Sequence, residues 1–158
     1  MISPKTLSAV AKRLDAELLF GDCSFESVST DSRALSHGEL FVALKGENFD
    51  AHDYLRQVVD SGACGLVLEK EDPSLAIPQL KVQDTTAALG VLAGYCREDF
   101  AGKVAAITGS SGKTTVKGLL ANILGYSGKV HATQGNLNNH IGVPLTLLAM
   151  EPGNDYLV

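Results

Sequence analysis

The sequence has few cysteines, no long apolar run and no cluster of basic residues, and each absence excludes a class of protein. The three cysteines, Cys23, Cys64 and Cys96, are far apart and form no C-x-x-C pair, which argues against a zinc site and a disulfide framework. We therefore expect buried thiols in a reducing compartment. The N-terminus lacks a basic segment followed by an apolar one, and no stretch approaches about 20 uninterrupted apolar residues. The sequence thus predicts a cytoplasmic protein without membrane insertion.

The charge balance limits the choice of partners. The formal net charge is -5 and Lys and Arg form no run, which excludes a broad nucleic-acid-binding surface. Any polyphosphate must therefore be captured locally. With 45% hydrophobic and 20% charged residues in 158 positions, the chain can bury a core as one domain or two small ones. Nothing in the composition indicates an oligomeric state.

Periodicity in the first half predicts alternating helices and strands. Ser3 and Pro4 are typical of a helix start, and the apolar spacing that follows predicts a helix to about Leu18. The elements predicted after it are a strand at 39–44, a helix at 52–61, a buried strand at 65–68 and a strand at 80–82. Two prolines and several acidic residues interrupt the pattern at 69–78, so we expect a loop there and a domain boundary near residue 82.

The second half repeats this alternation. Thr85 is expected to cap a helix whose apolar side chains share one face, namely Ala88, Leu89, Leu92, Ala93 and Cys96. The elements predicted after it are a strand from 104, a helix at 116–124, a short strand at 129–132, a helix from about 143 and a strand at 155–158. Such βα alternation predicts an α/β fold with a parallel sheet covered by helices. Because few strands follow residue 82, we expect the chain to be part of a longer protein.

The strongest functional signal is an apolar run that leads into Gly109-Ser110-Ser111-Gly112-Lys113-Thr114-Thr115. The glycines allow backbone N–H groups to turn inward around a phosphate, Lys113 supplies a cation, and the Thr114 hydroxyl can ligate Mg²⁺. The spacing is G-x-x-G-K-T, shorter than the usual loop, because Ile107 stands where that loop has its first glycine. The alternative is a glycine turn with an exposed lysine.

A second polar segment lies at 135–144, where Asn136, Asn138 and Asn139 stand between glycines. Asn side chains both donate and accept hydrogen bonds, which suits a polar ligand. The alternative is a solvent loop in which Asn tolerates unusual backbone angles.

A third segment combines Asp31-Ser32-Arg33 with a block at 38–52 that has the character of a strand followed by a polar turn. Taken alone, Asp31 and Arg33 are more typical of a surface ion pair than of a binding site. The combination of all three segments changes that interpretation.

Together the three segments resemble the Mur ligases, the ATP-dependent amide-forming enzymes of peptidoglycan precursor synthesis. The D-S-R, G-x-L-F-V-A-L-x-G and D-x-H sequences are similar to the N-terminal UDP-binding domain, and the short glycine loop is similar to the ATP site. The resemblance implies a small N-terminal α/β substrate-binding domain at 1–82 and a truncated P-loop, parallel-sheet ATP-binding domain at 83–158. The Asn-rich loop is similar to that of the member that adds D-alanyl-D-alanine to UDP-MurNAc-tripeptide.

The resemblance also implies roles for individual residues. ATP phosphates would be bound by 109–115, with catalytic roles for Lys113 and Thr114 and with Mg²⁺ on Thr114. The substrate-binding residues that it implies are Asp31, Ser32, Arg33, Gly46, Glu47, Asn48, Asn136, Asn138 and Asn139. His140 departs from the family, which often has an acidic residue there, so no ionic role is assigned to it.

The implied reaction begins with attack of the tripeptide carboxylate on the γ-phosphorus of ATP. The amine of D-alanyl-D-alanine then displaces phosphate from the resulting acyl phosphate. Stabilisation of charge on the γ-phosphate is the main requirement, so no base is needed from His37, His52 or His131, which we expect to be surface or packing residues. In the family an acidic metal ligand and a carbamylated lysine follow this region, so the 158 residues alone are not expected to ligate.

Three other functions use a similar loop. A diaminopimelate- or lysine-adding Mur ligase shares the first block but not the Asn-rich loop. A folylpolyglutamate synthetase shares the short phosphate loop, but the block at 31–49 argues against it. A nucleotide-dependent switch module would use the loop without forming an amide bond.

Overall fold

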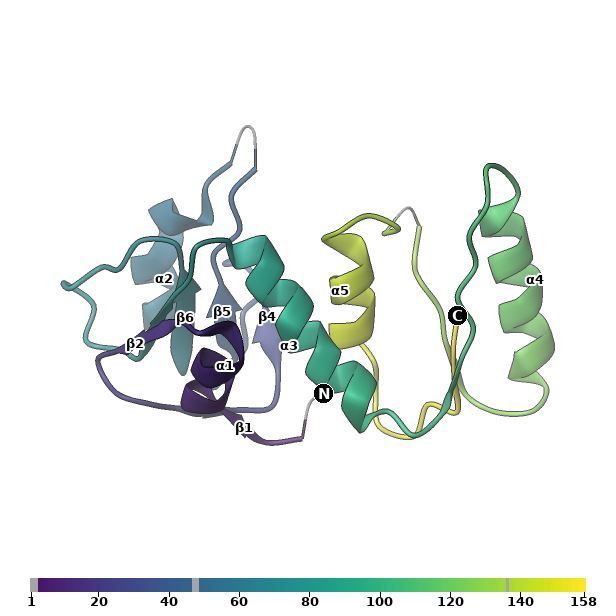
Figure 1. Ribbon diagram of the computed structural model, residues 1–158, viewed down its shortest axis with the longest axis horizontal. Coiled ribbons are helices and arrows are strands. Elements are labelled where there is room, and N and C mark those ends of the chain that lie inside the picture. The colour runs from purple at the N-terminus through teal and green to yellow at the C-terminus, as the bar shows by residue number, and fades with distance from the viewer. Residues whose placement is uncertain (1–2, 47–48, 136) are drawn as a thin grey trace.

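The chain folds into an α/β structure built on two separate main sheets (Figure 1). The structure is a computed structural model that describes residues 3–46, 49–135 and 137–158. The larger sheet has five strands in the order β2 (Glu17–Leu19), β7 (Gln79–Lys81), β6 (Gly65–Leu68), β5 (Leu40–Val42) and β4 (Val28–Ser29). Strands β4 to β7 are parallel, and β2 pairs antiparallel with β7. The predicted α/β class is therefore confirmed.

Alternate residues of the central strands enter two different cores. Leu40 and Val42 of β5 pack into a cluster with α1 (Leu7–Leu14) and α3 (Thr85–Asp99). Phe41 between them packs into the other cluster, with η1 (Ala51–Tyr54) and α2 (Leu55–Asp60). Successive strand side chains point to opposite faces, so helices cover both faces of the sheet and its central strands are apolar throughout.

The first helix is shorter than predicted. Its N-cap is Thr6, whose side-chain oxygen accepts a hydrogen bond from the Ala9 N–H at 3.3 Å, and the helix ends where Asp15 takes a left-handed φ of 50°. Residues at both ends of the predicted helix belong to strands: β1 (Lys5–Thr6) pairs antiparallel with β3 (Ser24–Phe25), and Leu18 lies in β2. The prediction of a helix from Ser3 to Leu18 was wrong at both ends because strand pairing, which periodicity does not report, competes for these residues.

Helix α3 has the predicted buried face but a different cap. Its five predicted core residues are all buried, at 3% exposure or less. The cap is Asp84, whose carboxylate accepts hydrogen bonds from the N–H groups of Thr86 at 2.7 Å and Ala87 at 3.1 Å. Thr85, the predicted cap, is the first residue of the helix and is itself buried.

The Asp84 cap gives a stability prediction. Replacing Asp84 by alanine leaves two N–H groups at the start of α3 without their acceptor, so we expect a loss of about 1 kcal/mol in the free energy of unfolding. Urea unfolding followed by circular dichroism measures it. Asp60→Ala, which removes an exposed carboxylate at the end of α2, is the control and should change stability by less than about 0.5 kcal/mol. Equal effects of the two substitutions would contradict the assignment of the cap.

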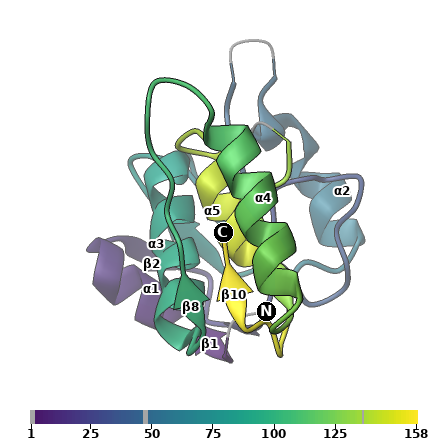
Figure 2. The same cartoon turned by 90° about the vertical axis from the view of Figure 1, so that its right-hand side faces the viewer.

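The smaller sheet has three parallel strands in the order β8 (Lys103–Val104), β10 (Tyr156–Leu157) and β9 (Val130–His131). It lies between α5 (Gly142–Leu148) and α4 (Lys113–Gly125) (Figures 1 and 2). Helix α5 packs against α3, and Met150 and Leu157 join the core cluster that contains Leu7 of α1. The chain therefore buries one apolar layer that continues from the larger sheet to the smaller one. The division into domains near residue 82 stays a prediction.

Helix α4 forms where its periodicity predicts, but none of its residues is buried. The apolar side chains of Val116, Leu119 and Ile123 are 50%, 59% and 64% exposed. Positions three and four residues apart lie on one side of a helix, so these side chains form a single exposed apolar face.

Candidate phosphate and substrate sites

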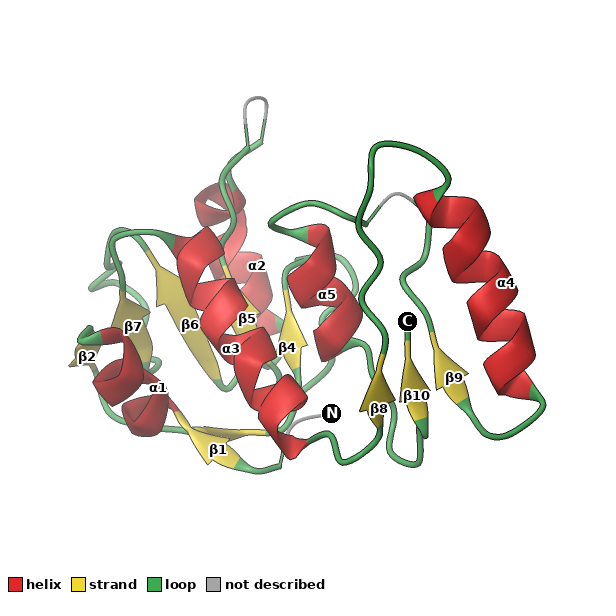
Figure 3. Cartoon of the chain, turned by 45° about the vertical axis from the view of Figure 1, so that its right-hand side comes forward, coloured by secondary structure: helices red, strands yellow, loops and turns green. Residues whose placement is uncertain are grey.

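The polar segments singled out in the sequence follow the carboxyl ends of parallel strands. The glycine loop follows β8 and the Asn-rich loop follows β9 in the smaller sheet, whereas Asp31 follows β4 and Lys45 follows β5 in the larger one. The strands of the smaller sheet and β6 of the larger one point in the same direction (Figure 3). Ligands of open α/β sheets bind in crevices at this edge, so both groups of candidate residues lie where such a site is expected.

The glycine loop ends in the first turn of α4. Gly109 has a φ of 148° and Gly112, the N-cap of the helix, has a left-handed φ of 74°. L-residues with a side chain rarely adopt these angles, which explains the two glycines. The Lys113 ammonium donates a hydrogen bond to the Gly109 carbonyl and so closes the loop. The N-terminus of α4, with its unpaired N–H groups and positive dipole end, faces the loop, and this arrangement suits an anionic phosphate.

A cavity of about 470 Å³ lies beside this loop. Residues of the phosphate loop, of the segment after β9 and of α5 line it together, among them Thr108, Lys113, Thr114, Thr133, Asn138 and Val143. The two predicted loops are thus brought to one cavity, although they are more than twenty positions apart in the sequence.

Thr114 is one of several threonines that line this cavity, and it follows Lys113 directly in the first turn of α4. It is exposed, borders the cavity, and offers a hydroxyl oxygen, the hard ligand type that Mg²⁺ prefers. The described part of the chain contains no group of three or more His, Cys, Asp or Glu residues that could hold a metal. Magnesium is commonly held by few protein oxygens together with substrate phosphates, so a single hydroxyl at the phosphate loop is compatible with that mode.

Lys117 is a cavity residue that sequence reasoning missed. Its ammonium donates hydrogen bonds to the carbonyl oxygens of Thr133 and, at 3.4 Å, Gly135. It therefore connects α4 to the segment after β9. The signal was present in the sequence, since Lys117 stands four residues after Lys113 and so projects from the same side of the helix.

The Asn-rich loop is held to α5 by one of its own side chains. The side-chain oxygen of Asn139 accepts hydrogen bonds from the N–H groups of Ile141 at 3.2 Å and Gly142 at 2.7 Å. Asn138 lines the cavity, and Asn136 lies outside the described residues. Of the predicted asparagines, Asn138 thus borders the phosphate-loop cavity, while the oxygen of Asn139 stabilises the start of the next helix.

Gly142 gives a second stability prediction. A Cβ at this position would lie 2.4 Å from the Leu137 Cα, a backbone atom that cannot move away without displacing the Asn-rich loop. We expect Gly142→Ala to lower the free energy of unfolding by about 1–3 kcal/mol. Gly118→Ala in α4 is the matched control, because nothing lies within 4 Å of its Cβ position. That substitution should raise stability by up to about 1 kcal/mol, since alanine has the higher helix propensity. Stabilisation by both substitutions in urea unfolding would refute the close approach.

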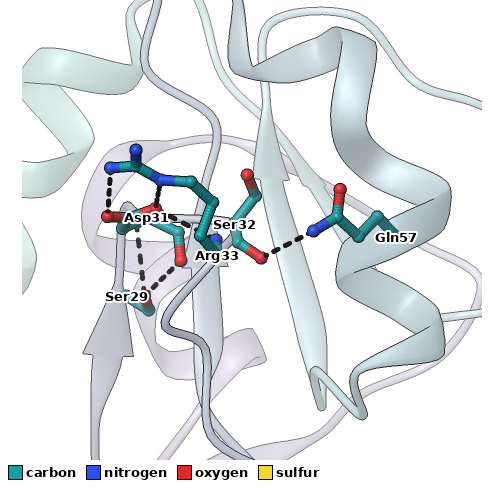
Figure 4. Close-up of polar contacts among 5 residues, drawn as sticks. All are labelled: Ser29, Asp31, Ser32, Arg33 and Gln57. Carbon is teal, nitrogen blue, oxygen red and sulfur yellow. Dashed lines mark hydrogen bonds and ion pairs between the residues drawn. The ribbon is translucent and has the colours of Figure 1, made fainter.

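Asp31 and Arg33 form a two-bond ion pair at the carboxyl end of β4 (Figure 4). The Arg33 Nε donates to Asp31 Oδ1 at 2.9 Å, and Nη2 donates to Oδ2 at 2.8 Å. This hydrogen bonding lowers the pKa of the Asp31 carboxyl to about 2. The Arg33 side chain is 83% exposed, so its remaining N–H groups are open to solvent. The surface ion pair considered from the sequence is present, and it holds the guanidinium in a fixed orientation at the sheet edge.

The neighbouring predicted residues have different surroundings. Ser32 is buried at 7% exposure, and its carbonyl accepts a 3.4 Å hydrogen bond from the Gln57 side chain of α2 (Figure 4). Gly46 donates its N–H to the Phe49 carbonyl at 2.7 Å, so these two residues lie side by side. The predicted residues Glu47 and Asn48 lie between them, outside the described part of the chain.

His52, expected to be a surface or packing residue without a partner, has two polar partners. Its Nε2 accepts a hydrogen bond from the Glu69 N–H at 3.2 Å, so Nδ1 carries the proton and donates to Asp50 Oδ1 at 2.6 Å. These contacts join the segments after β5 and β6. The signal was the D-x-H spacing, because an Asp that caps a helical turn also reaches the side chain two residues later.

A second cavity, of about 520 Å³, opens beside this histidine. Both signs of charge line it, from Lys45, Asp50, His52, Glu69, Lys70, Glu71 and Asp72. The predicted substrate block therefore borders a polar cavity at the end of the larger sheet, separate from the cavity of the phosphate loop.

Two family models match the chain. The model described as Mur ligase family, catalytic domain, matches residues 24–96, and the Mur ligase middle domain matches residues 107–158. The chain belongs to the Mur ligase family. In this Mur ligase the two matches cover the substrate block and the phosphate loop respectively, so the resemblance inferred from the motifs is confirmed.

Several of the proteins that the chain resembles belong to one class of Mur ligase. The chain is 48% identical over 153 residues to the UDP-N-acetylmuramoyl-tripeptide--D-alanyl-D-alanine ligase of Escherichia coli (strain K12), covering 97% of this chain and 34% of the relative. A crystal structure of MurF from Acinetobacter baumannii matches 99% of this chain and 35% of that one, with a TM-score of 0.87 and 40% identity. MurF from Thermotoga maritima, in complex with ADP, matches 84% of this chain and 31% of that one, with a TM-score of 0.76 and 34% identity. The chain thus spans about a third of the length of these relatives.

Among the described residues of this Mur ligase chain, no helix combines the length and apolar character that crossing a membrane requires.

Proposed function

We propose that the chain provides the UDP-substrate site and the ATP-phosphate loop of a ligase that joins D-alanyl-D-alanine to UDP-MurNAc-tripeptide. The observation that carries the proposal is the cavity shared by Lys113 and Asn138, because it combines the phosphate loop with the Asn-rich loop. The 48% identity to the Escherichia coli ligase of that name supports the same assignment. We further propose a cytoplasmic enzyme, with a substrate-binding domain at 1–82 and an ATP-binding domain beginning at 83.

The proposed chemistry needs stabilisation of phosphate charge more than it needs an acid or a base. The tripeptide carboxylate attacks the γ-phosphorus of ATP, ADP leaves, and the dipeptide amine then displaces phosphate from the acyl phosphate. Lys113 and the N–H groups at the start of α4 hold the phosphate oxygens on which charge develops. Thr114 is the residue proposed to hold Mg²⁺, which when bound neutralises phosphate charge.

The substrate is proposed to bind at the edge of the larger sheet. Arg33, oriented by Asp31, offers free N–H groups to an anionic group, and Gly46 follows β5, the strand next to β4. Charge-assisted hydrogen bonds from a guanidinium suit a phosphate, and the UDP part of the substrate supplies two. Ser32, Glu47 and Asn48 are proposed to complete this site, and Asn136 and Asn139 to join Asn138 at the other.

Calorimetry on the 158-residue chain tests the proposal. We expect measurable binding of UDP-MurNAc-tripeptide, because most residues proposed to contact it are in the chain, and weak binding of ATP with Mg²⁺. Tight ATP binding without UDP-sugar binding would reverse the assignment and favour a nucleotide-dependent switch. Binding of a folate in place of the UDP-sugar would favour a folylpolyglutamate synthetase.

A ligation assay on the same chain gives an independent result. Because the chain spans about a third of its relatives, we expect no ligated product from ATP, Mg²⁺, UDP-MurNAc-tripeptide and D-alanyl-D-alanine. Any turnover above a Lys113→Ala control would refute this expectation.

A further inference from the structure

Cys23 and Cys64 are distant in the sequence but adjacent in the fold. Cys23 immediately precedes β3, and Cys64 immediately precedes β6. A Cβ built on Gly65, the residue after Cys64, would lie 2.7 Å from the Cys23 Sγ. The sulfur of Cys23 therefore rests against the backbone next to Cys64, and this close approach explains a glycine at the start of a buried strand.

The two thiols influence each other's protonation. The neighbouring Cys64 thiol raises the pKa of Cys23, and the neighbouring Cys23 thiol lowers the pKa of Cys64. Both side chains are partly exposed, whereas the third thiol, Cys96, is buried at 3% exposure in α3, where burial raises its pKa. Reactive cysteines are accessible and have a lowered pKa, and of the three thiols Cys64 is the one that is partly exposed and has its pKa lowered.

We propose that Cys23 and Cys64 form a redox pair that hydrogen peroxide converts into an intramolecular disulfide. The Cys64 thiolate attacks one peroxide oxygen and the O–O bond breaks; the departing hydroxide takes a proton to give water, and Cys64 becomes a sulfenic acid. Cys23 then loses its proton and attacks the Cys64 sulfur, the S–O bond breaks, and a second water leaves. Two thiols and one peroxide thus give one disulfide and two waters. A dithiol reductant reverses the reaction by thiol–disulfide exchange.

The bridge would join the β1–β3 pair to the start of β6. The segment that it closes, 23–64, contains Asp31, Arg33 and Gly46. Restricting this segment in the unfolded chain stabilises the folded one, so we expect the oxidised protein to unfold at a temperature about 5–10 °C higher than the reduced protein. The inference does not depend on the proposed ligase activity.

Peptide mapping of the folded chain tests the proposal directly. Trypsin separates the three cysteines, because it releases 14–33 with Cys23, 57–70 with Cys64 and 82–97 with Cys96. After treatment of the native protein with hydrogen peroxide and blocking of free thiols, we expect a linked 14–33/57–70 peptide lighter by two hydrogens than the sum of its parts. Peptide 82–97 should carry the blocking group, and dithiothreitol should restore all three thiols.

Matched variants distinguish a Cys23–Cys64 disulfide from other oxidation products. Cys96→Ser should still give the linked peptide and the rise in unfolding temperature, whereas Cys23→Ser and Cys64→Ser should give neither. In Cys23→Ser, Cys64 should accumulate as sulfenic acid, which dimedone traps. Three free thiols after oxidation of the native protein, a link to Cys96, or a disulfide between two copies on a non-reducing gel would each overturn the proposal.

Discussion

Replacing Lys113 by alanine is expected to lower the rate of ligation by ~1000-fold, the largest effect of any substitution in the phosphate loop. Lys113 is the cation at the start of α4 and lines the same cavity as Thr114 and Asn138. Its loss removes the cation of the phosphate loop itself, on which stabilisation of the developing phosphate charge is proposed to depend. The rate is measured in a chimeric ligase in which this chain replaces the matching third of the Escherichia coli relative, with phosphate release as the readout.

Lys103→Ala is the control for Lys113→Ala. Lys103 is exposed in β8, at the opposite end of the strand that leads into the phosphate loop. Its removal changes the net charge equally but should leave the rate within about twofold, because the loss of an exposed charge at a distance is largely screened by salt. A Lys113→Ala chimera with the rate of the Lys103→Ala chimera would remove the phosphate loop from the proposed mechanism.

Arg33→Ala is expected to weaken binding of UDP-MurNAc-tripeptide at least ~10-fold, since a hydrogen bond to a charged group contributes about 1.5–3 kcal/mol. The Asp31 carboxylate already fixes the guanidinium through bonds of 2.9 and 2.8 Å, so little conformational freedom is lost when a ligand binds. Calorimetry on the 158-residue chain measures the dissociation constant. The free energy of unfolding should change little, because exposed ion pairs contribute little to stability.

A second arginine in the same chain provides the matched control. Arg13 forms a similar two-bond pair with Glu98, at 2.9 and 2.5 Å, where α1 meets the end of α3. Helix α3 begins after β7 and ends at Asp99, at the opposite end of the larger sheet from the loops that follow β4 and β5 (Figure 3). Arg13→Ala should therefore leave substrate binding unchanged. If both arginine variants bind as the unaltered chain does, Asp31 and Arg33 form only a surface ion pair.

The parts of the fold that depend on local pattern could be predicted from the sequence. The apolar run at 65–68 is a buried strand, and the apolar face of α3 is buried. Both patterns are dictated by residues a few positions apart, and burial reinforces them. The predicted start of the first helix was wrong because Lys5 and Thr6 pair with β3. Pairing between segments that are distant in the sequence leaves no local pattern.

The candidate sites, too, could be predicted where a local pattern determines them and not where contacts between distant segments do. The glycine loop was recognisable because its spacing itself creates the geometry, with the left-handed Gly112 leading into α4. The contacts of Lys117 with Thr133 and of His52 with Glu69 were not predicted, because each joins two segments that are distant in the sequence and that only the fold brings together. The Cys23–Cys64 pair escaped the sequence for the same reason, since neither cysteine has a partner nearby in the chain.

The central claim is that the chain has two ligand sites, one at the end of each sheet. Amide chemical-shift mapping of the isotopically labelled 158-residue chain tests this claim most directly. UDP-MurNAc-tripeptide is predicted to shift the signals of residues 29–33 and of Gly46. ADP with Mg²⁺ is predicted to shift those of 108–115, with the Lys113→Ala variant losing the second set only. UDP-sugar shifts confined to the phosphate loop, or ADP shifts at residues 29–33, would contradict the account.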